Sequence, residues 1–355
     1  FCAMLFVSSA WADDLSWADI RIIEAVKGLI MMVLGAALMS TWQRVRVAAA
    51  TLAIVAGLLA AVSVAQIATH STNELGGLVQ IQAGNLYADV TEPRAAGPVS
   101  DPNFYGQILL MVLPIAAFLA VTSRRRLVFA SIALVIFAGV LVTYSRGAML
   151  SVLAMCLVVP FVTKVKRGFI LKATLAAALL LVVAPVTVTR RFHTVTDIVA
   201  ETRGDQPEEA RDASVDKRKL LLGVGLRMFE DSPILGVGAG NFGKHYARYA
   251  NEIGSSAPQY DDPGDRQYPH SLYLELASEN GVVGLATFAA AMAIAFASLI
   301  RLRRNLLATS IAVALAGYLV SSMFLHSAYQ RYLWLLLAFV PAIARLAHQE
   351  EEVTA

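Results

Sequence analysis

The stretch that decides the fold is PHSLYLELASENGVVGL, from Pro269 to Leu285. It joins a long polar segment, Thr189–Gly281, to an apolar run, Val282–Ile300, that is close to the roughly 20 residues a helix needs to cross a bilayer. We expect a short helix over His270–Asn280, because Gly281 is suited to cap its C-terminus. The stretch therefore marks the place where a polar surface segment meets the membrane.

The composition is typical of a polytopic membrane protein. Hydrophobic residues make up 57% of the 355 residues, charged residues make up 15%, and the mean hydropathy is +0.61. A soluble domain carries about 25% charged residues. The net charge of +3 does not indicate a nucleic-acid partner, because the basic residues occur in short clusters between apolar runs. Cys2 and Cys156 lie in apolar surroundings, and we expect neither a disulfide nor a metal site there.

The apolar runs predict an all-α polytopic membrane protein with about nine transmembrane helices and one long extracytoplasmic loop. Their continuous apolar character favours helices over a β-barrel, whose strands alternate. Because the chain starts at Phe1, FCAMLFVSSAWA is interpreted as the tail of a helix that begins earlier, although it also imitates the end of a signal peptide. The runs are Ile22–Ser40 (with Glu24 and Lys27), Val47–Ala68, Phe104–Thr122, Leu127–Thr143, Gly147–Val162, Gly168–Val188, Val282–Ile300, Leu306–Leu325 and Tyr332–Ala347.

Basic clusters predict the orientation of these helices. They follow every second run, at Gln43–Arg46, Arg124–Arg126, Lys164–Arg167 and Arg301–Arg304, as the positive-inside rule requires of cytoplasmic loops. The other connections are then extracytoplasmic, at His70–Asn103, Tyr144–Arg146, Thr189–Gly281 and His326–Arg331. The chain thus divides into N-terminal transmembrane helices (1–188, truncated at the start), an extracytoplasmic loop with the motifs (189–281), and C-terminal transmembrane helices with a cytoplasmic tail (282–355).

The long loop is predicted to contain two amphipathic helices that lie over the membrane face, with a mobile flap between them. The first helix covers Pro207–Asp231 and ends at Ser232-Pro233. Its apolar residues Leu222, Leu226 and Phe229 recur at helical spacing on one side, with Arg218 in line. The glycines of GVGAGNFGKHY favour a tight turn, and Asn251–Tyr268 is rich in Gly, Pro, Ser and Asp and is predicted to be irregular.

Arg146 is the basic residue whose position is hardest to explain without a ligand. It lies in Tyr144-Ser145-Arg146-Gly147, between two apolar runs at the predicted outer boundary, where a charge is costly without a partner. A lipid-linked diphosphate is such a partner, because a guanidinium group binds phosphate oxygens bidentately and stays charged. The alternatives are a snorkelling arginine or a pair with Asp101.

His270 and Glu279 are the candidate catalytic residues. A neutral imidazole at the start of the short helix could take a proton from an incoming hydroxyl, and Glu279 could orient it or bind sugar hydroxyls. The simpler interpretations are a structural histidine at a helix start, and a Glu275–Glu279 pair that forms a polar helix face or binds an arginine.

Other polar residues have simpler interpretations. Asp101 is predicted to be a helix N-cap, and the Gly236–Gly240 run lacks the Lys-Ser/Thr of a nucleotide-binding loop. His326 and Arg331 flank a turn on the same predicted side and could add to a cationic site. Asp261, Asp262 and Asp265 could suggest a metal, but their Pro- and Gly-rich setting favours a solvated loop.

Four stretches of the chain form a recognisable set of motifs. They are SDPNFYGQ (Ser100–Gln107), YSRGAML (Tyr144–Leu150), RKLLLGVGLRMFEDSPILGVGAGNF (Arg218–Phe242) and HSLYLELASENGVVGL (His270–Leu285). Together they resemble the O-antigen ligase/polymerase family of bacterial inner-membrane glycosyltransferases. The resemblance runs from about Asn103 onward, and the last two motifs are specific in combination. The family's usual pattern has more membrane spans before the first motif.

The resemblance implies transfer of a glycan from undecaprenyl diphosphate to an acceptor on the periplasmic face, without nucleotide sugar, metal or other cofactor. The acceptor would be lipid A core for a ligase or a second lipid-linked glycan for a polymerase; a protein acceptor is a third outcome. By resemblance, Arg146 and Arg218 would bind the diphosphate, with Arg227 as a further candidate, and His270 would activate the acceptor.

A transporter or flippase of an anionic solute or lipid-linked glycan is the main alternative function. Transporters place charges near the bilayer midplane, whereas here the charges gather at one end of the predicted transmembrane helices. A non-catalytic scaffold is a third possibility, and it predicts that the arginines are individually dispensable.

Overall fold

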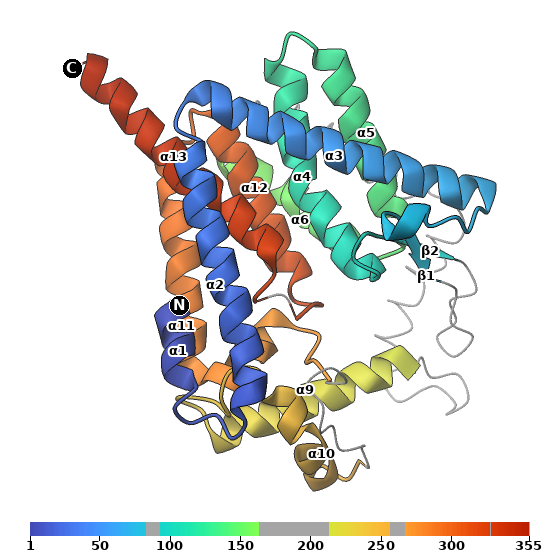
Figure 1. The fold of residues 1–355 in the computed structure, drawn as a ribbon, viewed down its shortest axis with the longest axis vertical. Coiled ribbons are helices and arrows are strands. Elements are labelled where there is room, and N and C mark those ends of the chain that lie inside the picture. The colour runs from blue at the N-terminus through green and yellow to red at the C-terminus, as the bar shows by residue number, and fades with distance from the viewer. Residues whose placement is uncertain (83–92, 163–212, 256–266, 327, 355) are drawn as a thin grey trace. The chain divides into compact units, whose positions relative to one another are not determined.

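The computed structural model describes residues 1–82, 93–162, 213–255, 267–326 and 328–354. These residues are mainly helical, and they form two compact units (Figure 1). Four features predicted above lie outside the described residues: the Lys164–Arg167 cluster, the Gly168–Val188 span, the segment 189–212, and the Asp261–Asp265 cluster.

The first unit comprises Phe1–Ala37, Ala213–Ala297 and Ser322–Ala338. It contains α1 (Cys2–Ser8), α2 (Leu15–Leu38), α9 (Ala213–Asp231), α10 (Phe242–Glu252), most of α11 (Leu272–Arg301) and the start of α13 (Arg331–Thr354). Its small core lies between α9 and α10, and it consists of Leu221, Val224, Met228, Phe242, Tyr246, Tyr249 and Ala250. The ring of Trp334 lies directly on Gly28, where any side chain would collide with it.

The second unit comprises Leu38–Asp212, Ser298–Ser321 and Phe339–Ala355. Its helices are α3 (Trp42–Thr69), α4 (Pro102–Thr122), α5 (Arg126–Val142), α6 (Arg146–Val162) and α12 (Leu306–Ser321). Helix α4 packs against α3, α5, α6 and α12, so it lies at the centre of this unit (Figure 1). The units divide the chain differently from the three topological segments predicted above.

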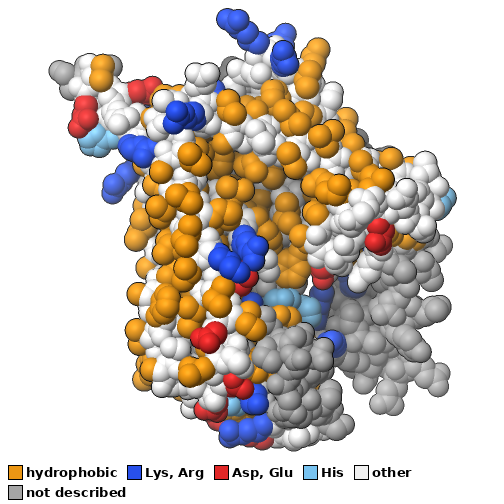
Figure 2. Space-filling view, in the orientation of Figure 1, with side chains coloured by type: hydrophobic (Ala, Val, Ile, Leu, Met, Phe, Trp, Pro, Cys, Tyr) orange, Lys and Arg blue, Asp and Glu red, His pale blue; other side chains and the backbone are white. Residues whose placement is uncertain are grey.

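Among the residues that the structure describes, four helices are long and apolar enough to cross a membrane: α3, α4, α11 and α13. The predicted runs at α5, α6 and α12 are apolar helices of 10–17 residues, and α2 carries Arg21, Glu24 and Lys27. The count of nine spans and the extracytoplasmic loop are therefore not confirmed, whereas a mainly helical chain with candidate membrane spans is. Hydrophobic side chains cover much of the described surface that Figure 2 shows.

The predicted outer loop His70–Asn103 contains elements that the sequence analysis missed. A single 3-10 turn, η1 (Leu75–Gly77), precedes two short antiparallel strands, β1 (Gln80–Gln82) and β2 (Arg94–Gly97). These strands are too short and too weakly patterned for periodicity to reveal them. Their pairing joins two separate segments, Gln80 with Gly97 for example, and a pattern within one segment does not reveal it.

The long loop also differs from its prediction. Helix α10 is an additional helix, and it includes Asn251 and Glu252, which were predicted to be irregular. Helix α9 ends at Asp231 as predicted, but Leu222 and Leu226 are about half exposed, at 50% and 48%. The buried side of α9 is the opposite one, because its partner is α10 and that contact was not foreseen.

Candidate functional site

The most specific local feature of the first unit is a break in α11 at Gly281. Gly281 has φ 62° and ψ −160°, so the helix stops at Asn280 and restarts at Val282, as the C-cap prediction required. A helix break leaves carbonyl groups unsatisfied on one side and N–H groups on the other. Both sets must find partners elsewhere in the fold.

The glycine-containing segment that follows α9 provides these partners. N–H groups of Val237 and Gly238 donate to the carbonyl groups of Ser278 and Glu279, in both cases over 2.9 Å. In the other direction, N–H groups of Val282 and Val283 donate to the carbonyl groups of Pro233 and Ile234 over 2.8 and 3.2 Å. The two most specific sequence motifs are thus held together by reciprocal backbone hydrogen bonds.

Glycine is required on both sides of this contact. A Cβ atom on Gly236, which has φ +69°, would lie 2.3 Å from the carbonyl carbon of Glu279. A Cβ atom on Gly281 would lie 2.3 Å from the carbonyl oxygen of Ile234. Both obstacles are backbone atoms, which cannot rotate away as a side chain can.

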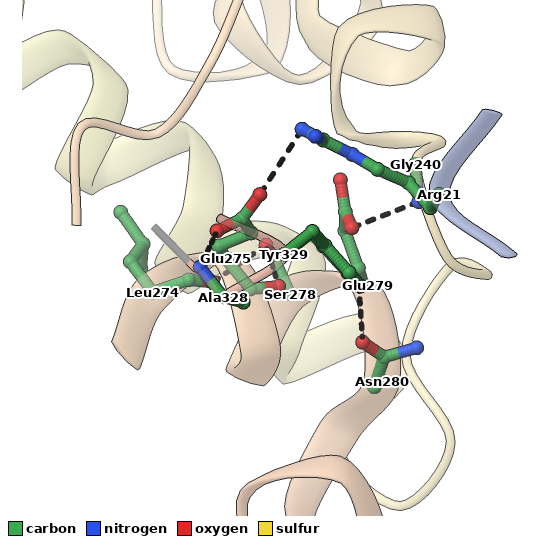
Figure 3. Close-up of polar contacts among 9 residues, drawn as sticks. All are labelled: Arg21, Gly240, Leu274, Glu275, Ser278, Glu279, Asn280, Ala328 and Tyr329. Atoms are coloured by element: carbon green, nitrogen blue, oxygen red, sulfur yellow. Dashed lines mark hydrogen bonds and ion pairs between the residues drawn. The ribbon is translucent and has the colours of Figure 1, made fainter. Parts of the chain in front are cut away.

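Glu279 connects the same two segments through its side chain. Its carboxylate is buried, and Oε2 accepts a hydrogen bond from the N–H of Gly240 over 2.8 Å (Figure 3). The next residue, Asn241, exchanges hydrogen bonds with the backbone of Asp14 at the start of the chain. Glu279 therefore lies where three separate segments of the first unit meet.

Glu275, one turn before Glu279, forms a buried ion pair with Arg21 of α2. Arg21 Nη2 and Glu275 Oε1 are 3.1 Å apart, and Glu275 Oε2 accepts the N–H of Ala328 over 3.3 Å (Figure 3). The guanidinium group of Arg21 also lies over two aromatic rings, 5.1 Å from the Tyr268 centroid and 4.8 Å from that of Tyr329. Of the interpretations considered for Glu275, the arginine partner is the one that the structure confirms.

Tyr329 closes this network on the other side of Arg21. Its hydroxyl donates to Asn280 Oδ1 over 3.3 Å, just before the helix break. Burial, followed by the nearby carboxylates of Glu279 and Glu275, raises the pKa of the Tyr329 phenol well above its ordinary value. The phenol therefore stays protonated and remains a hydrogen-bond donor.

His270 occupies an unusual backbone conformation directly before α11. Its φ is 50°, in the left-handed region that few residues other than glycine adopt. Its ring is partly buried and meets the ring of His326 edge-on at a centroid distance of 5.3 Å. The His326 ring in turn stacks on Tyr268, with centroids 4.0 Å apart and planes 6° from parallel.

These aromatic contacts connect His270 to the buried ion pair through Tyr268. The sequence motifs did not suggest Arg21, Tyr268, Tyr329 or Asn280. Arg21 could have been noticed, because a charge at the border of the Ile22–Ser40 run needs a partner. Within the described residues, no group of three or more His, Cys, Asp or Glu could hold a metal ion.

Arg218 and Arg227 both lie on the exposed side of α9, in the same unit as His270. Arg227 forms ion pairs with Glu230 at 3.1 Å, and with Asp231 and Glu252 at 3.7 Å each. A phosphate group would have to compete with these three carboxylates for Arg227. Arg331, predicted as a possible addition to a cationic site, pairs bidentately with Glu24.

Arg146 belongs to the second unit, where it is the first residue of α6. The preceding turn is held by Arg94 of β2, whose Nε donates to the carbonyl of Thr143 over 2.9 Å. Ser145 caps α6, because its Oγ accepts the N–H of Ala148 over 3.3 Å. Arg146 is thus presented, partly buried, at the positive end of a helix dipole.

The SDPNFYGQ motif builds the start of α4 in the same unit. The side chain of Asp101 accepts the N–H groups of Asn103 and Phe104, which confirms the predicted N-cap. Asn103 Oδ1 accepts a hydrogen bond from Arg94, and the buried Gln107 donates to Ser321 of α12 over 2.7 Å. This motif therefore supports the turn that carries Arg146.

Comparison with known proteins agrees with the motif content. The family described as O-antigen ligase matches residues 131–289, a range that contains the YSRGAML stretch, the Arg218–Phe242 stretch and the His270–Leu285 stretch. No curated protein matches the chain. Members of this family act on lipid-linked glycans in a membrane setting. This match over residues 131–289 supports the resemblance of the chain's motifs to the O-antigen ligase/polymerase family.

Proposed function

We propose that the protein transfers a glycan from undecaprenyl diphosphate to an acceptor hydroxyl on the periplasmic face of the bacterial inner membrane. His270 takes the proton of the acceptor hydroxyl, and the resulting oxygen attacks the anomeric carbon of the donor glycan. The bond between that carbon and the diphosphate oxygen breaks, and undecaprenyl diphosphate leaves. No metal or nucleotide is needed, because the diphosphate is already a good leaving group.

The conformation of His270 is the observation that carries this proposal. A non-glycine residue at φ 50° costs free energy, and such strain gathers at functional sites. The imidazole is also oriented by rings rather than left to rotate, because it meets His326, which stacks on Tyr268. A proton acceptor held in one orientation needs little rearrangement when the acceptor hydroxyl binds.

Arg146 and Arg218 are the proposed diphosphate ligands. Arg146 combines a guanidinium group with the N-terminus of α6, and both attract anions. Arg218 lies on the exposed side of α9, where a lipid headgroup can reach it. Arg227 is the weaker candidate, because three carboxylates already surround it.

Glu279 supports the site through its position rather than through proton transfer. Its Oε2 is occupied by the N–H of Gly240, and it links the glycine segment to the helix that follows His270. We therefore propose that Glu279 positions His270, and that its removal disturbs both the fold and the reaction. Direct contact of Glu279 with the substrate stays a prediction.

The decisive experiment is glycan transfer in membranes from a synthetic undecaprenyl-diphosphate oligosaccharide, with EDTA and without nucleotide sugar. Lipid A core and a second lipid-linked glycan are offered separately as acceptors. Transfer to the core identifies a ligase, whereas a lengthened lipid-linked product identifies a polymerase. Solute or lipid translocation without release of undecaprenyl diphosphate would refute the enzyme and favour a transporter.

Matched variants make the residue assignments testable. His270→Ala, Arg146→Gln and Arg218→Gln are expected to lower transfer by about 100-fold or more, the usual contribution of a general base or a charge-stabilising group. The controls are His348→Ala and Arg248→Gln, which change exposed residues of the tail and of α10 and should leave transfer near wild type. Full transfer by both His270→Ala and Arg146→Gln would refute the assignment.

A further inference from the structure

A second site is suggested by a cavity in the second unit, which contains none of the proposed catalytic or diphosphate-binding residues. Its volume is about 830 Å³, and it lies among the start of α3, the α11–α12 connection and the end of α13. Its charged lining residues fall into two groups. Arg301 is the last residue of α11 and Arg304 lies in the connection that follows it, whereas Glu350 and Glu351 come from α13.

The walls of the cavity are held in place by specific contacts. Thr41 caps α3 through its side chain, and Asn305 Oδ1 accepts the N–H groups of Leu307 and Ala308 at the start of α12. Arg345 of α13 donates to the carbonyl of Met39 over 3.2 Å, which ties α13 to the segment before α3. The cavity is therefore part of the fold and not a gap between loose ends.

Trp42 adds an unused donor to the lining. Its indole Nε1 is buried and has no hydrogen-bond partner among the residues that the structure describes. A buried indole N–H normally finds an acceptor. Its ring can also face a cation, which an ammonium group would supply.

The position and the charge pattern together define the ligand. The cavity is bordered by the ends of α3, α11 and α13, three helices able to cross a membrane, so it lies at the depth of lipid headgroups. Two arginines and two glutamates in the lining of one cavity match a headgroup with one phosphate and one ammonium group. We infer that this cavity binds a phospholipid with a phosphoethanolamine headgroup, with the phosphate on Arg301 and Arg304 and the ammonium on Glu350 and Glu351.

The test measures which lipids stay with the purified full-length protein. The protein is exchanged into an equimolar mixture of ethanolamine, glycerol and choline phospholipids with identical acyl chains, and retained lipids are quantified by mass spectrometry. Wild type should enrich the ethanolamine lipid about fivefold, the effect of one exposed ion pair. Arg301→Gln with Arg304→Gln should reduce retention of every phospholipid.

The two charge groups are distinguished by a change in preference. Glu350→Gln with Glu351→Gln should keep phosphate binding but shift the preference from the ethanolamine to the glycerol lipid. Arg303→Gln is the matched control, because Arg303 lies in the same connection but does not line the cavity. It should behave as wild type.

Three results would overturn the proposal. These are equal retention in wild type and the double arginine variant, an unchanged preference in the double glutamate variant, and full competition by free phosphoethanolamine, which would reassign the cavity to a soluble phosphate ester.

Thermal unfolding of each variant checks that it is folded. Trp42→Phe gives an independent measurement, because it removes the indole N–H and should weaken lipid retention. Glycan transfer plays no part in this measurement, so its outcome does not depend on the proposed reaction.

Discussion

Replacing Gly236 by alanine tests whether the contact between the glycine segment and the α11 break stabilises the first unit. The new Cβ atom would meet two backbone atoms, the carbonyl carbon of Glu279 at 2.3 Å and the nitrogen of Asn280 at 2.4 Å. Neither can move without disturbing α11. The segment must therefore shift away from the helix.

The cost follows from what that shift breaks. Alanine at φ +69° carries about 1–2 kcal/mol of backbone strain. Loss of the Val237–Ser278 and Gly238–Glu279 hydrogen bonds, both 2.9 Å, adds about 1–3 kcal/mol for each buried group left without a partner. We expect Gly236→Ala to lower the free energy of unfolding by about 4 kcal/mol.

Gly254→Ala is the matched control. Gly254 has φ +80°, but its Cβ atom would have nothing within 4 Å. This variant should therefore show the strain alone, about 1–2 kcal/mol. The difference between the two variants isolates the close approach from the backbone conformation.

The assay is reversible unfolding in mixed micelles, followed by tryptophan fluorescence. Gly281→Ala should be about as destabilising as Gly236→Ala, and the double variant should cost less than the sum, because both changes break one contact. Equal destabilisation by Gly236→Ala and Gly254→Ala would refute the reasoning. Strict additivity of Gly236→Ala and Gly281→Ala would also contradict a shared contact.

Three further predictions concern buried polar groups of the first unit. Arg21→Met should cost about 3–5 kcal/mol because it leaves the Glu275 carboxylate buried and unpaired, and adding Glu275→Leu should recover most of this loss in a double-mutant cycle. Burial lowers the pKa of His245 below its ordinary value of 6.5, so the unfolded state binds a proton at a higher pH than the folded state does. The free energy of unfolding should therefore fall as the pH drops below about 6.5. His245→Asn should reduce this pH dependence in unfolding measurements. Tyr329→Phe should cost about 1 kcal/mol through loss of the hydrogen bond to Asn280. Because the folded pKa of Tyr329 is raised, wild type should also lose stability above about pH 10, where the unfolded phenol ionises, and the phenylalanine variant should lose less.

Local sequence signals predicted several boundaries correctly because neighbouring residues determine them. Ser232-Pro233 ends α9, Asp101 caps α4, and Gly281 interrupts α11, in each case through steric or hydrogen-bonding preferences of a few adjacent residues. The same approach missed α10 and the β1–β2 pair. Their stability comes from partners that lie elsewhere in the chain.

The candidate site likewise contains residues that local sequence signals identified and residues that only the fold reveals. The motifs identified His270 and the arginines as residue types suited to proton transfer and phosphate binding. They did not identify Arg21 or Tyr329, because a buried ion pair or a ring contact is visible only once both partners are placed. Glu279 was recognised as a residue that could orient His270 or bind sugar hydroxyls, and its bond to Gly240 supports the positioning role.

The sequence alone thus determined the mainly helical, apolar character of the chain, the interruption at Gly281 and the family resemblance of its motifs. Apolar runs and glycine conformations act over one or two helical turns, so they can be recognised without a fold. Only the tertiary structure joined Arg21 to Glu275, which are 254 residues apart, and matched the glycine segment to the broken helix. The physical reason is that buried charges and backbone groups require partners, and the fold decides which segments supply them.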